Sequence, residues 1–93
     1  MIDNFKCKST KELWETGKSK RIPASLRRAA LRKLVLIDDA EEYKDLMVPP
    51  GSRLEELKGD RAGQHSIRIN DQWRICFNWV DSDAHNVEIV DYH

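Results

Sequence analysis

The spacing of apolar residues changes partway along this chain, from a helical period in the first half to a period of two in the second. After Pro23, apolar residues recur three or four positions apart, which is typical of a helix with one buried face. Proline suits the first turn of such a helix, where its missing N–H would have had no partner. The predicted buried stripe consists of Leu26, Ala30, Leu34 and Ile37.

A shorter helix is predicted before this one. Ser9 and Glu12 have the Ser-x-x-Glu spacing of a capping box, which marks the start of a helix. We expect this helix to turn Leu13 and Trp14 inward and to end near Gly17.

From residue 54 onward, apolar and polar residues alternate, which predicts half-buried antiparallel strands. Asn70-Asp71 predicts a tight hairpin turn, residues 81–84 connect the next pair of strands, and residues 54–58 are expected to add another strand. For the two tryptophans of this segment we favour a core position over base stacking. The positions predicted to face the helices are Ile67, Ile69, Trp73, Ile75, Phe77, Trp79, Val87 and Ile89.

These elements predict an α+β fold. Two to three N-terminal helices, the third within residues 39–46, would pack on one face of a small antiparallel sheet of three to four strands. A length of 93 residues favours a single domain spanning residues 1–93. The chain has no apolar run of about 18 residues and lacks the pattern of a secretory signal, so we expect a cytoplasmic protein without a membrane partner.

Cysteine and histidine spacing does not indicate a metal or cofactor site. Cys7 and Cys76 lie far apart in the chain, so we interpret both as packing thiols. No His-x-x-x-His, Cys-x-x-Cys or Asp-rich loop motif is present. His65 has the parity of the helix-facing residues and His85 lies beside a turn, so neither is expected to be catalytic. We therefore expect neither a metal nor another cofactor.

Charge is balanced overall but uneven along the chain. The net charge is zero, yet residues 1–33 hold ten Lys or Arg against three Asp or Glu. This basic first third fits either a solvated helix face or a contact with nucleic acid. The sequence pI is about 6.8, so the protein as a whole is not strongly basic.

Strand parity brings three polar side chains to the sheet face opposite the helices. If Ile75 points to the helices, Arg74 points away, and the same alternation places Arg68 and Tyr92 on the open face. Exposed strands commonly carry arginine. However, Arg74 lies on a middle strand, where an isolated solvated charge would gain little from its neighbours.

Three segments of the chain resemble one family of proteins. These are Leu57-Lys58-Gly59-Asp60-Arg61, Trp73-Arg74-Ile75 and the terminal Asp91-Tyr92-His93. In combination and at these separations they resemble the HigB (host inhibition of growth) toxins of the RelE/ParE superfamily. The resemblance covers nearly the whole chain in length and in the order of elements.

This resemblance implies the toxin of a bacterial type II toxin–antitoxin system. Such a toxin is a ribosome-dependent endoribonuclease that cuts messenger RNA during translation and inhibits growth. Its implied partners are the ribosome, messenger RNA and a cognate HigA-type antitoxin with a helix-turn-helix domain. The sequence pI of about 6.8 is low for a ribosome-binding protein, which makes the basic first third the expected ribosomal contact. The toxin–antitoxin complex is expected to bind its own operator DNA through the antitoxin.

The candidate residues suit RNA cleavage without a metal, in which the 2′-hydroxyl attacks the adjacent phosphate. His93, with an ordinary pKa near neutrality, is the expected acid or base, and Tyr92 would position it or stack on a base. Asp91 would orient His93 or an arginine, or would be a solvated carboxylate at the chain end. The candidates for contact with phosphate are Lys58, Arg61, Arg68 and Arg74.

One position departs from the pattern of the family. Some members carry a histidine three residues before the lysine of the Leu-Lys-Gly motif, where this chain has Glu55. Glu55 is a candidate general base in its place, and we expect a slow nuclease. On a regular strand, Glu55 and Lys58 would lie on opposite faces unless a bulge intervenes.

Two other functions are open on the same fold. A ParE-like gyrase inhibitor would act without nuclease chemistry, although the terminal Asp91-Tyr92-His93 counts against it. A non-catalytic RNA-binding or ribosome-binding module is the other alternative, and the missing second histidine is its best support.

Overall fold

The computed structural model describes residues 1–91, and its elements follow the predicted order. Helices α1 (Lys8–Thr16) and α2 (Ala24–Asp39) come first, and three short 3₁₀ helices follow at Tyr43–Met47, Pro50–Ser52 and Gly59–Arg61. The strands are β1 (Glu55–Glu56), β2 (His65–Arg68), β3 (Trp73–Val80) and β4 (Asp83–Asp91).

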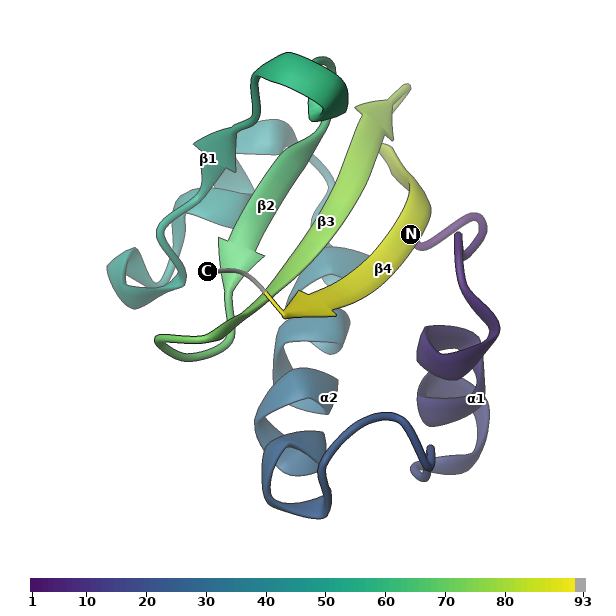
Figure 1. Ribbon diagram of the computed structural model, residues 1–93. Helices are drawn as coiled ribbons and strands as arrows, with labels where there is room; N and C mark the ends of the chain where they lie inside the picture. Colours follow the sequence, from purple (N-terminus) through teal and green to yellow (C-terminus); the bar gives the residue numbers. More distant parts are fainter. Residues whose placement is uncertain (92–93) are drawn as a thin grey trace.

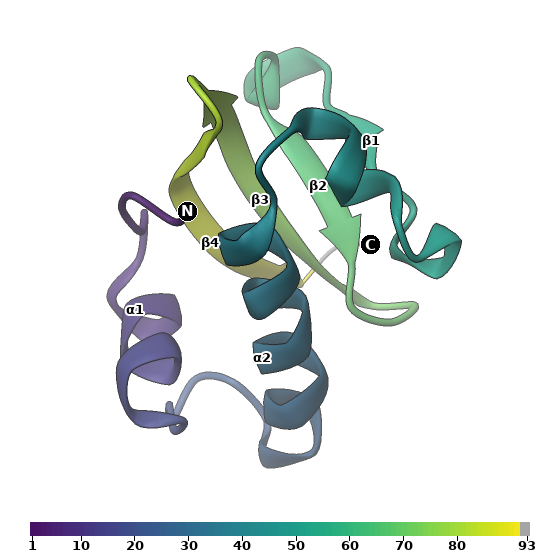
Figure 2. The same cartoon turned by 180° about the vertical axis from the view of Figure 1, so that it is seen from behind.

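The four strands form one antiparallel sheet in the order β1-β2-β3-β4. Helix α2 lies behind this sheet in Figure 1 and in front of it in the view from behind in Figure 2, and α1 lies to the side, next to α2 and β4. One sheet face is therefore covered and the other is open. The predicted α+β fold class and the sequential pairing of strands are confirmed.

Helix α2 buries the predicted stripe. Leu26, Ala30, Leu34 and Ile37 are all buried in the core. They pack against Ile67, Ile75, Phe77, Val87 and Ile89 of the sheet. Trp73 and Trp79 pack against the same core and are partly buried, which confirms the preference for core over base stacking.

Helix α1 begins differently from the prediction. Cys7 is the N-cap residue, no side chain caps the helix, and Ser9 lies inside the first turn, so the predicted capping box is wrong. The reason is a tertiary contact, because the buried Thr10 hydroxyl accepts the backbone N–H of Ile89 at 3.0 Å. The predicted end is confirmed, since Gly17 closes the helix with a left-handed φ of +79°.

The predicted hairpin turns are present. The Asn70 side chain accepts the backbone N–H groups of Gln72 and Trp73 at 2.9 and 2.8 Å, which closes the turn between β2 and β3. Asp81 and Ser82 between β3 and β4 have φ values of +51° and +68°. Two consecutive left-handed residues are typical of a two-residue hairpin turn that matches the strand twist.

The N-terminal segment runs parallel to β4, which the sequence did not predict. Isolated bridges join Ile2 to Ala84 and Phe5 to Val87. Between these contacts β4 carries a bulge, because its pairing with β3 shifts register and Asn86 has a φ of +54°. The segment thus covers part of the β4 edge, which would otherwise offer unpaired backbone groups.

Within residues 1–91, no helix is long and apolar enough to cross a membrane.

Candidate functional site

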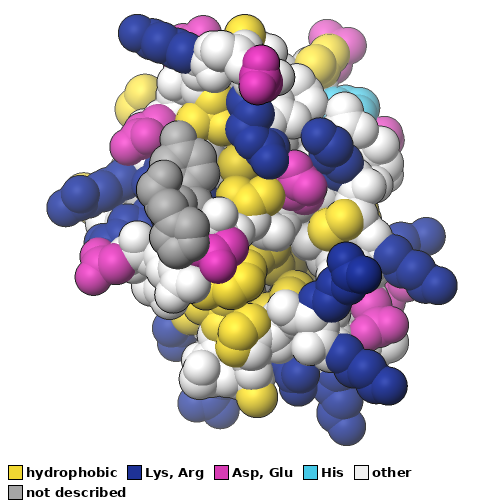
Figure 3. All heavy atoms as spheres, viewed as in Figure 1, with side chains coloured by type: hydrophobic (Ala, Val, Ile, Leu, Met, Phe, Trp, Pro, Cys, Tyr) yellow, Lys and Arg dark blue, Asp and Glu magenta, His cyan; other side chains and the backbone are white. Residues whose placement is uncertain are grey.

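The open face of the sheet carries mostly polar side chains from β2, β3 and β4. In the register of β2, β3 and β4, Ile67, Ile75 and Ile89 lie opposite one another and point to the helices. The residues between them therefore point to the open side. These are Ser66, Arg68, Arg74, Cys76, Glu88 and Val90. Figure 3 looks onto this face and shows Lys and Arg side chains on both sides of a central band of hydrophobic side chains.

Arg74 lies on this side of β3, but it is not exposed. Only 8% of the residue is accessible to solvent. Its Nε donates to the Ser66 hydroxyl at 2.7 Å, and its Nη2 donates to the Arg53 carbonyl at 2.7 Å and to the Ser66 carbonyl at 3.4 Å. The Glu55 carboxylate lies 3.9 Å from Nη2. The guanidinium is thus held rigidly by β2 and by the chain that leads into β1.

Arg74 therefore lies on the face that parity predicted, but it is buried there and is not a solvated side chain. Parity assigns a side chain to a face, but it does not reveal that the loop before β1 lies against that face. The loop approaches closely at Arg53, which has a left-handed φ of +46° and whose carbonyl contacts the guanidinium. Sequence reasoning missed Ser66 and Arg53 as partners of Arg74.

Glu55 and Lys58 do not lie on one regular strand. Strand β1 contains only Glu55 and Glu56, and Lys58 is already the N-cap of the 3₁₀ helix Gly59–Arg61. The prediction that these two side chains lie on opposite faces of one strand therefore does not apply. Both side chains are exposed, and Glu55 lies beside Arg74 at the edge of the open face.

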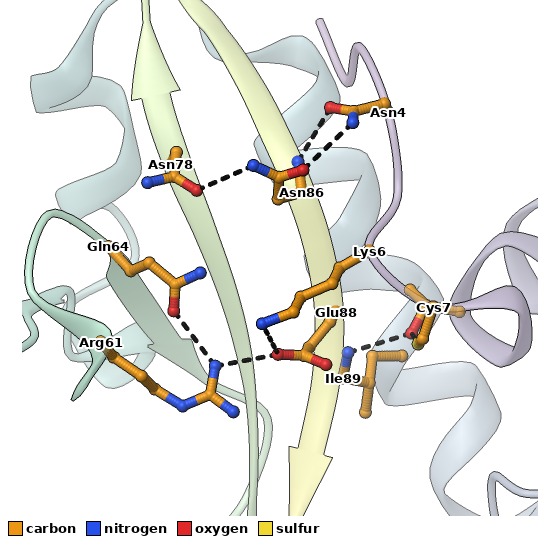
Figure 4. Close-up of polar contacts among 10 residues, drawn as sticks. Asn4, Lys6, Cys7, Arg61, Gln64, Asn78, Asn86, Glu88 and Ile89 are labelled. Atoms are coloured by element: carbon orange, nitrogen blue, oxygen red, sulfur yellow. Dashed lines mark hydrogen bonds and ion pairs between the residues drawn. The ribbon is translucent and has the colours of Figure 1, made fainter.

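Arg61 enters the open face from the 3₁₀ helix and meets a carboxylate that the sequence analysis missed. Its Nη1 donates to Gln64 at 3.1 Å and to Glu88 of β4 at 2.9 Å. The Nζ of Lys6, from the N-terminal segment, lies 3.8 Å from the same Glu88 oxygen. Figure 4 shows these three side chains converging over β3 and β4. Alternation along β4 could have identified Glu88, because Glu88 lies between the buried Val87 and Ile89 and must point to the open face.

Asparagines join the strands at the other end of this face. Asn86, at the bulge of β4, contacts Asn4 through its backbone N–H at 2.9 Å and its side chain at 3.2 Å, and it contacts Asn78 of β3 at 3.2 Å (Figure 4). Asn78 also donates to the carbonyl of Gly63 at 3.2 Å. These bonds connect the N-terminal segment to the loop that carries Arg61.

Arg68 lies at the end of β2 and forms a close ion pair with Asp71 of the following turn. Its charge also acts on Lys33 of α2, whose Nζ donates to the Ser52 hydroxyl at 2.7 Å. Burial, and then the charges of Arg32 and Arg68, lower the pKa of Lys33 below its ordinary value. Lys33 of α2 is therefore close enough to Arg68 for their charges to interact.

The remaining candidate residues fall into two groups. Asp91 ends β4 and accepts a hydrogen bond from the Gln72 side chain at 3.1 Å. Tyr92 and His93, which were predicted to position and perform the proton transfers, lie outside the described residues.

The other histidines lie away from Arg74. His65 points to the helix side, where its Nδ1 is 3.1 Å from the Tyr43 hydroxyl and its ring is 6.1 Å from that of Phe77. His85 lies 3.2 Å from Asp3.

Cys76 is fully buried beneath the open face, opposite Glu88 in the register of β3 and β4. Burial is the main cause that raises the pKa of its thiol, so the neutral form is favoured. This confirms the interpretation of Cys76 as a packing residue. Among residues 1–91, no three or more His, Cys, Asp or Glu side chains gather where they could hold a metal ion.

Solved structures of toxins share this architecture. The YoeB–YefM complex from Staphylococcus aureus contains a chain that matches with a TM-score of 0.62 at 17% identity, covering 100% of this chain and 98% of that one. A mutant of YafQ from E. coli also matches with a TM-score of 0.62, at 11% identity, covering 98% of this chain and 93% of that one. At these identities the likeness establishes the fold, a small α+β domain of the RelE-like kind.

Sequence comparison identifies the family within that fold. Residues 3–93 match the model of the HigB-like toxins, described as RelE-like toxins of the type II toxin–antitoxin system HigB. "Toxin HigB-1" of Vibrio cholerae is 45% identical over 87 residues, which cover 92% of each chain. "Endoribonuclease HigB" of Proteus vulgaris is 38% identical over 93 residues, which cover 100% of each chain. The chain belongs to the HigB-like family of toxins, as the motifs around Lys58, Arg74 and Asp91 indicated.

Proposed function

We propose that this protein is the toxin of a type II toxin–antitoxin system and acts as a ribosome-dependent endoribonuclease on messenger RNA, which stops translation and growth. Family membership and the full-length similarity to a relative named an endoribonuclease support this proposal. The structural observation that carries it is the fixed guanidinium of Arg74 in the floor of the open face. A cation held in place in this way stabilises developing negative charge without having to reorganise.

The proposed reaction is transfer within the RNA itself. The 2′-hydroxyl attacks the adjacent phosphorus while the bond from phosphorus to the 5′-oxygen of the next nucleotide breaks. A base takes the proton of the 2′-hydroxyl, and an acid returns one to the departing 5′-oxygen. The products are a 2′,3′-cyclic phosphate and a 5′-hydroxyl. These steps require neither a metal nor another cofactor.

Cations would stabilise the additional negative charge on the phosphorane. Arg74 is the central candidate because two of its nitrogens are already positioned by Ser66 and Arg53. Arg68 and Arg61 lie on the same side of the sheet, and Lys58 begins the 3₁₀ helix that carries Arg61. RNA would compete with Asp71 and Glu88 for these two arginines, so phosphate binding and ion pairing are alternatives at each.

Proton transfer would be shared between the chain end and β1. His93 is the proposed acid or base, Tyr92 its positioning or stacking residue, and Asp91 its orienting carboxylate. Glu55 is the proposed second acid–base group, and its position 3.9 Å from Arg74 supports this role because base and cation would meet at one phosphate. With one histidine and one carboxylate in place of two histidines, we propose a slow enzyme.

The proposed partners are an antitoxin, the ribosome and messenger RNA. The S. aureus YoeB structure was solved as a complex with YefM, which supports an antitoxin partner for a protein of this fold. The finer proposal is a HigA-type antitoxin with a helix-turn-helix domain, through which the complex binds its operator DNA. The ten basic residues within residues 1–33 are the proposed contact with the ribosome.

Primer extension on a defined transcript in a translating extract tests the proposal. We expect cuts confined to translated regions and absent without ribosomes. Arg74→Lys keeps the charge but cannot reach Ser66 and Arg53 with the same fork, so cutting should fall by about 100-fold or more. Unchanged cutting by a natively folded Arg74→Lys protein would remove Arg74 from the mechanism. Arrested growth without cuts would point to gyrase poisoning or to ribosome blocking without cleavage.

A further inference from the structure

A buried serine links helix α2 to the loop that holds Arg74. This loop, called here the 49–53 loop, includes the 3₁₀ helix Pro50–Ser52 and leads into β1. Ser52 is buried, and its hydroxyl accepts a hydrogen bond from the Nζ of Lys33 at 2.7 Å. Lys33 belongs to α2, which lies behind the sheet (Figures 1 and 2). The bond therefore joins the covered side of the sheet to a loop that reaches the open face.

The 49–53 loop is a compact turn that carries this connection to Arg74. The backbone N–H groups of Ser52 and Arg53 donate to the carbonyls three residues earlier, at 2.9 and 3.1 Å. Arg53 has a left-handed φ of +46°, which a residue with a side chain rarely adopts and which the surrounding contacts must maintain. Its carbonyl accepts a hydrogen bond from the Nη2 of Arg74 at 2.7 Å. The residue bound by Lys33 and the residue that orients Arg74 are thus direct neighbours in the chain.

We propose that Lys33 and Ser52 are positioning residues for RNA cleavage, because their hydrogen bond fixes the 49–53 loop and the loop fixes the guanidinium of Arg74. The proposal rests on the function proposed above, in which Arg74 stabilises the negative charge on the phosphorane. Neither positioning residue would touch the RNA, since Ser52 is buried and Lys33 lies on α2. Both would act through Arg74.

The two anchors of Arg74 differ in what holds them in place. Ser66 belongs to β2, which is paired with β1 on one side and with β3 on the other. Arg53 lies outside the strands, so its position depends on the contacts of the 49–53 loop. If the loop were released, Nη2 would lose the Arg53 carbonyl while Nε kept the Ser66 hydroxyl. A guanidinium that has to reorganise as charge develops stabilises the transition state less well.

The loop also determines where Glu55 lies. Glu55 follows Arg53 by two residues, and its carboxylate is 3.9 Å from the Nη2 of Arg74. A shift of the loop would therefore displace the proposed acid–base group together with one anchor of the cation. Misplacement by about 1 Å costs up to about 100-fold in rate. Because Ser66 would still hold Nε, we expect a smaller loss of about 5- to 10-fold.

A contact between Lys33 and the ribosome is the competing explanation. Lys33 is one of the ten basic residues within residues 1–33, so its replacement also removes a charge from the proposed ribosomal contact. Its ammonium group, however, is directed at a buried hydroxyl of its own chain. Ser52→Ala breaks the same hydrogen bond without changing any charge, so it separates the two explanations.

Single-turnover cleavage tests the proposal, with the protein in excess over ribosomes programmed with a defined transcript. Lys33→Met and Ser52→Ala should each lower the saturating rate by about 5- to 10-fold and leave the half-saturating protein concentration within about 2-fold of wild type. The double variant should cut no more slowly than the slower single variant, because both changes break one hydrogen bond. The matched controls are Lys44→Met and Ser25→Ala at exposed residues, and both should cut within about 2-fold of wild type.

Hydrogen exchange at the Arg74 side chain provides a second readout that needs no RNA. The Nε–H of Arg74 is buried and donates to Ser66, so its exchange with solvent should be slow in the wild-type protein. NMR of protein with isotope-labelled arginine should show exchange about 10-fold faster in Lys33→Met and Ser52→Ala. The backbone amides of β3 are the internal reference and should be unchanged, because a general loss of stability would accelerate all of them together.

The outcomes separate this proposal from the proposed function. If folded Lys33→Met and Ser52→Ala proteins keep the saturating rate and the Arg74 exchange of wild type, the proposal is overturned, although the cleavage function stands. If only Lys33→Met raises the half-saturating concentration, at an unchanged saturating rate, Lys33 is a ribosomal contact and the proposal is overturned. If wild type does not cut, the proposed function is wrong, and exchange at Arg74 still decides whether Lys33 and Ser52 hold the guanidinium.

Discussion

The open face of the sheet and the outer side of α2 both carry arginines, but they are built in opposite ways. On the open face, Arg74 and Arg61 are held by several hydrogen bonds each, and the core lies directly beneath them. On α2, Arg28 and Arg32 are exposed beside aliphatic side chains. A rigid array of cations suits one small charged group, such as a phosphate, at a fixed place. Exposed cations beside aliphatic side chains form no such fixed array.

The largest expected effect concerns the rigidity of the open face. Arg74→Ala should lower the free energy of unfolding by about 3 kcal/mol, because the buried Ser66 hydroxyl and the Arg53 carbonyl lose their partner. Arg68→Ala is the matched control. It should cost less than about 0.5 kcal/mol, because its partner Asp71 is 98% exposed. Urea denaturation of both variants measures the difference, and equal losses would mean that Arg74 is not a structural anchor.

A smaller effect is expected at the covered side of the sheet. Thr10→Val should lower the free energy of unfolding by about 1–2 kcal/mol, because the backbone N–H of Ile89 would be left buried without an acceptor. At temperatures where the variant is folded, its rate of RNA cleavage should equal that of wild type, because Thr10 lies behind the open face. An unchanged melting temperature would show that this anchor of α1 is dispensable.

A change of charge on the open face should alter RNA affinity modestly. Glu88→Gln removes the carboxylate that neutralises Arg61 and Lys6, so binding of a short single-stranded RNA should tighten by about 3-fold at low salt. Fluorescence anisotropy measures this affinity. The control is Asp39→Asn at the exposed end of α2, which should change the affinity less. Weaker binding by Glu88→Gln would indicate that the ion pair holds Arg61 in its binding position.

The smallest effect concerns Lys33, at the border between the two surfaces. Its folded-state pKa is lowered, so between that value and the unfolded value of 10.5 the unfolded chain binds more protons. Stability should therefore rise with pH through this window and fall as pH drops through the folded pKa. Compared with the Lys33→Met variant, the free energy of unfolding of the wild-type protein should change by a few tenths of a kcal/mol across this window, because solvent screens the charge. Parallel stability curves for the two proteins at alkaline pH would contradict this.

The sequence predicted the elements whose pattern is local. The stripe on α2, the Asn70 turn and the alternation from Ile67 to Ile89 all depend on neighbours along the chain, and the structure confirms them. The start of α1 did not follow the local signal. Thr10 is engaged with β4, 79 residues away, and Ser9 does not cap the helix.

The site could be predicted as a set of residues on one face, but its contacts could not. Parity correctly placed Arg68 and Arg74 opposite the core. The burial of Arg74 depends on where the loop before β1 runs, and the left-handed Arg53 gives no signal in the sequence because left-handed residues are usually Gly or Asn. The N-terminal segment beside β4 was also missed. It pairs with β4 through only two isolated bridges, and its residues show no clear alternation of apolar and polar positions.

The measurement that tests the central claim most directly is cleavage of a defined transcript in a translating extract. Wild type, Arg74→Lys and Thr10→Val are compared side by side at a temperature where all three are folded. The account predicts that Thr10→Val cuts like wild type, whereas cutting by Arg74→Lys falls by about 100-fold or more. The opposite pattern, with a cutting Arg74→Lys protein and a folded but inactive Thr10→Val protein, would contradict it.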